Sequence, residues 1–239
     1  MNLKPPQPLQ FHPNTNEPFL RLRNHKNVIL TPYRLDDTTG LVRILNDPLV
    51  YKWLYSTKFP FTLEDAKTWL DQTLSKSDAM LAELADGPDY ISGTPLTAIR
   101  EIQEDGTDIL IGNITLARFT HGEIFNTETV DWENADENIA ENLKLETGNP
   151  NIIWTIGDYL ASTHHGRGIM SDAIQTIVYD WGVPKMNVRR MMIGAMVDNP
   201  ASIKVFAKND FKFWRRITDF DYSPYWGRMR DVEFHEWTL

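Results

Sequence analysis

The sequence predicts a mixed α/β fold organised around a mostly antiparallel sheet, and three observations lead to this prediction. Strand and helix patterns alternate through the C-terminal half of the chain. Two apolar stretches, 96–102 and 109–119, flank an Asp-Gly pair that is a strong hairpin signal. Near the start, a strand pattern over 27–31 is followed by helical spacing over 35–45. Together these patterns favour one domain of packed helices and strands.

The ordered domain is expected to begin near Phe19. Residues 1–18 lack periodicity and are rich in proline, so we interpret them as an extended N-terminal arm. Residues 19–239 then form a single domain, because 41% of the chain is hydrophobic and no break in composition is sharp enough to separate a second unit. A second helix is predicted after Thr62, because Asp65 stands three residues on, as in a capping box.

The middle of the chain predicts further strands and one acidic insertion. Strands are expected over 80–84, 96–102 and 109–119, with the last two paired as an antiparallel meander. Residues 121–149 then carry many acidic side chains against a single lysine. This composition predicts a long, solvated excursion. The excursion could border a substrate entrance and attract a cationic amine, or it could be a solvated loop and nothing more.

Composition and charge exclude several classes of function. The net charge of −9, from 33 acidic and 24 basic residues, repels phosphate backbones, so a nucleic-acid partner is not expected. No apolar run approaches the ~20 residues that span a bilayer, and the polar N-terminus does not resemble a secretory signal. We therefore expect a cytoplasmic protein with no membrane partner, with a nuclear location left open. The chain has no cysteine, which excludes thiolate zinc sites and cysteine nucleophiles.

A strand, a glycine loop and a helix follow one another in the third quarter of the chain. Residues 152–156 form a buried-strand pattern that leads to the loop 165–168, His-Gly-Arg-Gly. Apolar spacing from Ile169 predicts a helix that ends at Gly182 and Pro184. A helix N-terminus presents unpaired N–H groups, and glycines let the backbone approach an anion. The sequence therefore predicts a diphosphate site formed mainly by backbone N–H groups.

A second strand and helix follow this unit. Residues 191–197 form a strand pattern, after which Asn199 suits a helix N-cap and Pro200 the first helical position. The helix is expected to run to about Lys208. Two further strands are predicted over 211–214 and 232–237. The segment around this helix is locally basic, which suits an anionic cofactor.

Two segments, His165 to Ala173 and Asp198 to Phe211, resemble the acetyl-CoA motifs of the GNAT superfamily and, within it, the RimJ/RimL-like (Acetyltransf_3-type) acetyltransferases. The resemblance extends from Asn27 to the C-terminus. Met170 departs from the small residue that usually ends the first motif, although Gly-Ile-Met is a familiar variant among these relatives. Asp210 stands where the second motif usually has glycine, which implies a somewhat different turn.

The resemblance implies the GNAT fold, a central mixed, mostly antiparallel twisted sheet flanked by helices on both faces. It also implies acetyl-CoA as co-substrate and no metal. The residues placed by the motifs against the cofactor are Leu160, Ala161, His165, Gly166, Arg167, Gly168, Ile169, Met170, Asn199, Ser202 and Phe206. Many relatives have a tyrosine where this chain has Phe206. A direct phosphate contact from Arg167 is left open, since a loop arginine is often solvated.

The reaction that the resemblance implies is direct attack of a neutral amine on the acetyl thioester. A backbone N–H near Leu160 and Ala161 would hold the carbonyl oxygen. Asp158 is the first candidate for the base, because it interrupts an apolar strand and burial would raise its pKa. Alternatively, Asp158 is an exposed turn carboxylate, and His164, His165 or a water relay serves as the base.

Ser202 is the candidate for protonating the departing thiolate, although a serine in the first turn of a helix can equally hydrogen-bond the backbone. Tyr222 and Tyr225 are reserve candidates for this proton transfer. Three aromatic residues are candidates for lining the acceptor pocket or, alternatively, for the core: Trp53, Tyr55 and Trp69.

The leading functional hypothesis is an acetyl-CoA-dependent N-acetyltransferase of the EC 2.3.1 type, acting on a primary amine of a protein N-terminus or a small molecule. The alternative is an acyl-CoA-binding protein without turnover, which is motivated by Phe206 in the tyrosine position. A phosphate-loop nucleotide enzyme is discounted, because the Gly-Lys-Ser/Thr ending is missing after Gly168. Both a monomer and a homodimer are compatible with the sequence.

Overall fold

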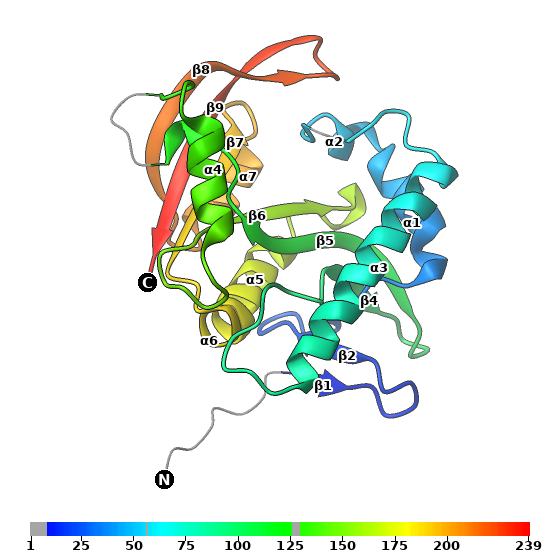
Figure 1. Ribbon diagram of the computed structural model, residues 1–239. Helices are drawn as coiled ribbons and strands as arrows, with labels where there is room; N and C mark the ends of the chain where they lie inside the picture. The colour runs from blue at the N-terminus through cyan, green and yellow to red at the C-terminus, as the bar shows by residue number, and fades with distance from the viewer. Residues whose placement is uncertain (1–8, 56, 126–129) are drawn as a thin grey trace.

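The computed structural model describes residues 9–55, 57–125 and 130–239 of the chain. In these ranges nine strands form one twisted sheet in the order β1-β2-β3-β4-β5-β6-β7-β9-β8 (Figure 1). The strands are β1 Gln10–Phe11, β2 Pro18–Arg21, β3 Val28–Thr31, β4 Ala98–Ile102, β5 Asp108–Arg118, β6 Ile153–Leu160, β7 Arg190–Met196, β8 Lys212–Ser223 and β9 Arg228–Thr238. Neighbouring strands are antiparallel except β6 and β7, which are parallel. The predicted mixed, mostly antiparallel sheet is confirmed.

The helices occupy the connections between these strands. The α-helices are α1 Thr38–Leu45, α2 Pro48–Tyr51, α3 Leu63–Ala85, α4 Ala135–Lys144, α5 Ile169–Thr176, α6 Val183–Met186 and α7 Pro200–Ala207. Short 3-10 turns are η1 Leu35–Asp37, η2 Gly122–Ile124 and η3 Ser162–His164, and η4 Ile177–Gly182 is a π-helical turn. None of the helices in the described ranges is both long and apolar enough to cross a membrane.

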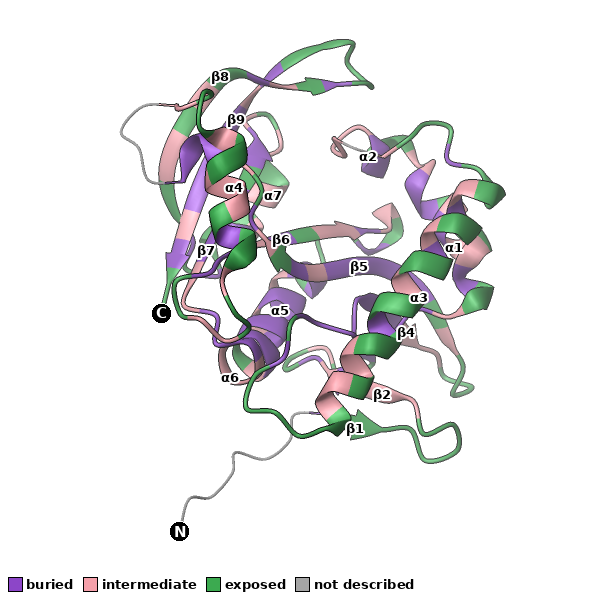
Figure 2. Cartoon of the chain, viewed as in Figure 1, coloured by how far each residue is buried: buried purple, intermediate pink, exposed green. Residues whose placement is uncertain are grey.

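The core lies on both faces of the sheet. Ala98 packs in a cluster with the apolar residues of α1 and α3, whereas its neighbour Ile99 packs in a cluster with α5. Successive side chains of a strand point to opposite faces, so these helices cover opposite faces of the sheet. Figure 2 shows α5 largely buried, while α3 keeps an exposed outer side.

The predicted opening of the second helix is confirmed, but its end is not. The Thr62 hydroxyl accepts from the N–H of Asp65, and the Asp65 carboxylate accepts from the N–H of Thr62, so the capping box is formed. The predicted strand over 80–84 is wrong, because α3 continues to Ala85. A short apolar run has no period that separates a strand from a helix, and here Leu84 packs against the main core as part of the helix.

Two further boundaries differ from the predictions. The predicted N-terminal arm, residues 1–18, includes residues that belong to the sheet, because 10–11 pair with 18–19 at its edge. Residues 1–8 lie outside the described ranges. The helix after the glycine loop does not stop at Gly182 and Pro184, since the π-helical turn leads into α6. It ends at Asn187, whose φ of 55° is the left-handed conformation of a helix C-terminus.

The described part of the acidic insertion, residues 121–125 and 130–149, is folded against the sheet and is not only a solvated loop. It contains η2 and α4, and Asn142 of α4 is buried. The Asn142 amide donates to the carbonyls of Phe119 and Ile153, and its oxygen accepts from the N–H of Ile153. Arg118 also donates to the carbonyls of Asn142 and Leu145. These bonds hold α4 across the ends of β5 and β6.

Candidate active site

The centre of the sheet is split between β6 and β7. These parallel strands pair only at Ile153 with Arg190 and at Trp154 with Met191. Beyond this point β6 stays paired to β5 and β7 stays paired to β9, so the two strands diverge. A cavity of about 610 Å³ occupies the opening and is lined by residues 155–160 of β6 and 194–196 of β7. The edge of β6 therefore exposes backbone groups to the cavity.

The glycine loop lies at one end of this cavity. Gly166 and Gly168 have φ of 73° and 79°, a region that disfavours side chains, and both residues line the cavity. Gly168 is the N-cap of α5, and Ile169 and Met170 continue the lining from its first turn. The first N–H groups of an α-helix have no partner within the helix. The loop and α5 thus present backbone donors at a positive helix end, which suits an anion.

The Arg167 side chain does not line the cavity. Its guanidinium donates to Glu101 on β4 over 2.8 Å, and the other Glu101 oxygen lies 3.1 Å from Nε2 of His164. Burial acts to raise the pKa of Glu101, but the hydrogen bonds from His164 and Arg167 hold this pKa below its ordinary value. In this structure Arg167 and His164 therefore fasten the loop to β4.

The end of β6 offers one backbone donor to the cavity. The N–H of Ala161 donates to the carbonyl of Ile111 over 2.7 Å, and Ala161 is not a lining residue, so the prediction of a free donor at Ala161 is wrong. N–H groups alternate in direction along a strand, so the N–H of Leu160 points away from β5 and toward the opening. The carbonyl of Leu160 lies 2.8 Å from Nε2 of His165.

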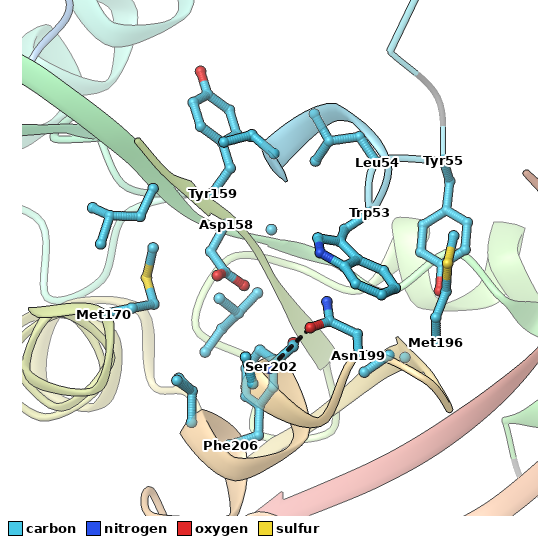
Figure 3. Close-up of a pocket in the computed structure, with 18 of the residues that line it drawn as sticks. Trp53, Leu54, Tyr55, Asp158, Tyr159, Met170, Met196, Asn199, Ser202 and Phe206 are labelled. Atoms are coloured by element: carbon cyan, nitrogen blue, oxygen red, sulfur yellow. Dashed lines mark hydrogen bonds between the residues drawn. The ribbon is translucent and has the colours of Figure 1, made fainter. Parts of the chain in front are cut away.

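Asp158 lies in the middle of this wall. It is a half-buried residue of β6, not part of an exposed turn, and it lines the cavity. Figure 3 shows its carboxylate directed into the cavity. Burial raises its pKa to about 7, and within the described part of the chain no group hydrogen-bonds the carboxylate. Near neutral pH this carboxyl can therefore both accept and release a proton.

The opposite wall comes from α7. Asn199 caps this helix by accepting from the N–H of Ser202 over 3.3 Å, and both residues line the cavity (Figure 3). Phe206 also lines it and packs edge-on against Phe211, with ring centroids 5.2 Å apart. Asp210 has a φ of 64°, so it adopts a left-handed conformation that glycine favours. The turn after α7 is thus formed without the glycine of the motif.

Aromatic residues form the far end of the cavity. Trp53 and Tyr55, which follow α2, line it, whereas Trp69 does not and packs edge-on against Tyr33 at 4.9 Å. Tyr222 and Tyr225 are also absent from the lining, and Tyr225 instead contacts Tyr51 with ring centroids 6.0 Å apart. Two of the three predicted pocket aromatics therefore reach the cavity, and the reserve tyrosines do not.

The charges in the cavity are distributed unevenly. Lys204 of α7 and Lys208, the C-cap residue of the same helix, line it. Asp221 of β8 lines the aromatic end, where burial raises its pKa against the lowering effects of the Tyr222 backbone and His121. Burial also raises the pKa of Tyr55, whose buried hydroxyl has no hydrogen-bond partner among the residues that the structure describes. Within residues 9–55, 57–125 and 130–239, no three His, Asp or Glu side chains gather to hold a metal ion.

Residues 27–212, more than three quarters of the chain, match the family model described as "Acetyltransferase (GNAT) domain". The chain belongs to this GNAT acetyltransferase family. The resemblance carried by the glycine loop and the α7 segment is thereby confirmed. In this GNAT domain the diverging strands β6 and β7, the glycine loop and α7 border one continuous cavity.

Known proteins similar to this GNAT domain include acetyltransferases. The chain is 26% identical over 145 residues to the ribosomal-protein-serine acetyltransferase of Escherichia coli K12, a match covering 61% of this chain and 66% of that protein. The fold is similar to that of Mycobacterium smegmatis RimJ in complex with CoA-disulfide, with a TM-score of 0.58, 19% identity, and coverage of 93% and 87% of the two chains. It is also similar to the microcin C7 self-immunity acetyltransferase MccE in complex with acetyl-CoA and AMP, with a TM-score of 0.57, 14% identity, and coverage of 90% and 93%.

Several lining residues of the GNAT cavity were not predicted from the sequence. Tyr159 adjoins Asp158 and could have been found from its place in the same strand. Phe220 and Asp221 belong to the far part of β8, which the sequence prediction ended at residue 214. His121 is the one residue that the described part of the acidic insertion contributes to the lining.

Proposed function

We propose that this chain is an acetyl-CoA-dependent N-acetyltransferase that transfers acetyl to a primary amine. The observation that carries this proposal is the single cavity between β6 and β7, which the glycine loop and the Asp158 carboxylate both line. The similar MccE structure is a complex with acetyl-CoA and AMP, and the similar RimJ structure is a complex with CoA-disulfide. The acetyl thioester and the amine would meet where the two strands diverge.

The residues present fit an acyl-CoA. The backbone N–H groups of the glycine loop and the first turn of α5 suit a pyrophosphate, and Lys204 and Lys208 supply positive charge nearby. The exposed edge of β6 can hydrogen-bond an extended amide chain such as a pantetheine arm, as one further strand would. The fit thus rests on a cradle for the anion and an unpaired strand edge for the amides.

The protein groups then have separate tasks. Bound acetyl-CoA would supply the thioester that the amine attacks. The N–H of Leu160 polarises the carbonyl that faces it, and Asp158 accepts the proton that the attacking amine must lose. The Ser202 hydroxyl lines the same cavity from α7, and we propose that it would donate a proton to the departing sulfur and regain one from water. Phe206 offers no hydroxyl for this step.

The acceptor we propose is the amine of a protein N-terminus. The aromatic end of the cavity carries Asp221 and lies beside Trp53 and Tyr55, so it suits a cationic group with an apolar stem. The E. coli relative is named a ribosomal-protein-serine acetyltransferase, which makes peptides with an N-terminal serine the first acceptors to assay.

Calorimetric titration with acetyl-CoA tests the proposal. Gly168→Trp places a bulky side chain in the loop and should abolish binding. Gly106→Trp is the matched control, because Gly106 also has a positive φ of 84°, meets nothing within 4 Å at its Cβ position and does not line the cavity. Binding by the wild-type protein and the control alone supports the site, and thiol release with peptide amines then tests transfer. If the wild-type protein does not bind acetyl-CoA, the proposal is wrong.

A second function is favoured by one observation. Phe206 lines the cavity where many relatives have tyrosine, so a phenolic proton donor is missing there. An acyl-CoA-binding protein without turnover would bind acetyl-CoA but release no thiol with any amine. Phe206→Tyr separates the two possibilities. If the variant releases thiol with an amine and the wild-type protein does not, the wild-type chain is a binding protein without turnover.

A further inference from the structure

The loop between β2 and β3 is fastened to the first turn of α5. The backbone N–H groups of Asn24 and His25 both donate to one carboxylate oxygen of Asp172 over 2.8 Å. The Asn24 side-chain amide donates to the other oxygen over 3.0 Å. Asp172 is buried, and burial acts to raise its pKa, but its hydrogen bonds with His25 and Asn24 hold this pKa below the ordinary value. A buried carboxylate therefore organises this loop.

The ring of His25 contacts both Asp172 and the glycine loop. Its Nδ1 lies 2.8 Å from the same Asp172 oxygen, and its Nε2 lies 3.0 Å from the carbonyl oxygen of Arg167. An ionised carboxylate and a peptide carbonyl both accept hydrogen bonds and cannot donate them. Each ring nitrogen therefore faces an acceptor, and Nε2 is the nitrogen in position to donate to the Arg167 carbonyl.

The hydrogen bond from His25 to the Arg167 carbonyl also fixes the direction of the Gly168 N–H, which belongs to the same peptide group. A trans peptide is planar, and its C=O and the following N–H point in opposite directions. The Arg167 carbonyl is turned toward His25, which does not line the cavity, so the N–H of Gly168 is turned away from His25. Gly168 lines the cavity, and as a glycine it adopts its φ of 79° without side-chain strain, so the hydrogen bond from His25 can select this orientation of the peptide.

We propose that His25 is a positioning residue for cofactor binding, which holds the Arg167 carbonyl so that the Gly168 N–H faces the pyrophosphate of an acyl-CoA. This inference rests on the proposed function of the cavity. His25 precedes the region matched by the GNAT family model, which begins at residue 27. The tether therefore comes from a residue outside the matched region.

Two substitutions of His25 separate its two hydrogen bonds. His25→Gln places an amide N–H near the position of Nε2 and keeps the donor to the Arg167 carbonyl. His25→Asn places its amide near the position of Nδ1 and keeps only the donor to Asp172. Arg23→Ala is the matched control, because Arg23 ties the same loop to η4 through Asp180, with Nε 3.1 Å from the carboxylate, and does not reach the glycine loop.

The measurement is the Kd of acetyl-CoA by calorimetry, with the melting temperature of each variant recorded beside it. Loss of the hydrogen bond from Nε2 should raise the Kd about tenfold in His25→Ala and His25→Asn. His25→Gln should stay within about threefold of wild type, and Arg23→Ala should bind as wild type. A change in stability alone would affect Gln and Asn variants alike, so rescue by Gln and not by Asn identifies the positioning role.

The outcomes distinguish the two proposals. If wild-type protein does not bind acetyl-CoA, the proposed function fails and the role of His25 fails with it. If wild type binds and the Ala and Asn variants bind equally well, the cavity remains a cofactor site but His25 does not position its loop. Equal weakening by Gln, Asn and Ala would also overturn the inference, because the Nε2 donor would then not be the group that matters.

Discussion

The hydroxyl of Ser162 in η3 donates a hydrogen bond to the carboxylate of Asp47, the N-cap residue of α2. The same carboxylate accepts from the N–H of Leu49 over 2.9 Å. The contact joins two sides of the cavity, because η3 leads into the glycine loop while α2 leads into Trp53 and Tyr55. Asp47 thus ties the proposed acceptor wall to the proposed cofactor wall.

Removing the Ser162 hydroxyl should loosen this connection. We expect Ser162→Ala to lower the free energy of unfolding by about 1.5 kcal/mol, because a hydrogen bond to a charged group is lost. The KM for the amine should rise severalfold while the Kd of acetyl-CoA stays unchanged. Urea denaturation and steady-state kinetics measure the two effects. A double-mutant cycle with Asp47→Ala is the control, and strict additivity of the two substitutions would show that the bond contributes nothing.

Asp158 should set the pH dependence of transfer. Its pKa is raised to about 7 by burial, and only the ionised carboxylate can take the proton of the amine. The rate should therefore increase as the pH rises through about 7 and level off above it, until other groups titrate. Asp158→Asn should lower kcat by about 10²- to 10⁴-fold without changing the Kd of acetyl-CoA. An Asn variant with full activity would assign the base to water or to another group.

The same carboxyl should affect stability in a defined pH window. A raised pKa means that the folded chain holds a proton between about pH 4 and 7 that the unfolded chain has released. The free energy of unfolding therefore falls as the pH rises through this window. Asp158→Asn removes this pH dependence. The free energy of unfolding of the variant, relative to that of wild type, should therefore increase by about 1 to 2 kcal/mol from pH 5 to pH 8, allowing for screening by water in the cavity. Asp71→Asn, at an exposed position of α3, should show no such gain.

The turn after α7 gives a prediction that is independent of function. Asp210 is exposed and has a φ of 64°, a conformation that is unfavourable for residues with a side chain. Asp210→Gly should raise the free energy of unfolding by about 0.5 kcal/mol, since relief of this strain exceeds the entropy that glycine adds to the unfolded chain. Asp210→Ala should lower it by a similar amount. Equal effects of the two variants in urea denaturation would contradict the strain argument.

Local signals in the sequence located the parts of the site that are formed by consecutive residues. The glycine loop with its helix, and the Asn199 cap of α7, depend on neighbours a few positions apart, so their residue types predict them. The divergence of β6 and β7 depends on which distant strands pair, and no local pattern encodes that. The later part of β8 was missed because Arg215, Arg216 and Asp219 interrupt its apolar alternation, and Asp221 was missed with it.

Asp221 should determine how the enzyme responds to charge in the acceptor. It lines the aromatic end of the cavity and is partly buried, so its field is screened less than that of a surface carboxylate. We compare two peptides that begin with serine and differ at the second residue, one with lysine and the other with norleucine. Asp221→Asn should raise the KM of the lysine peptide about three- to tenfold and leave the norleucine peptide unchanged.

The control for this comparison is Asp219→Asn, because Asp219 lies on the same strand, is exposed and does not line the cavity. Added salt should reduce the preference of the wild-type protein for the lysine peptide, since the attraction is electrostatic. If Asp221→Asn raises the KM of both peptides equally, the residue shapes the pocket and does not attract the charge of the lysine. If Asp221→Asn and Asp219→Asn raise the KM of the lysine peptide equally, the attraction comes from the overall charge of −9 and not from the Asp221 carboxylate.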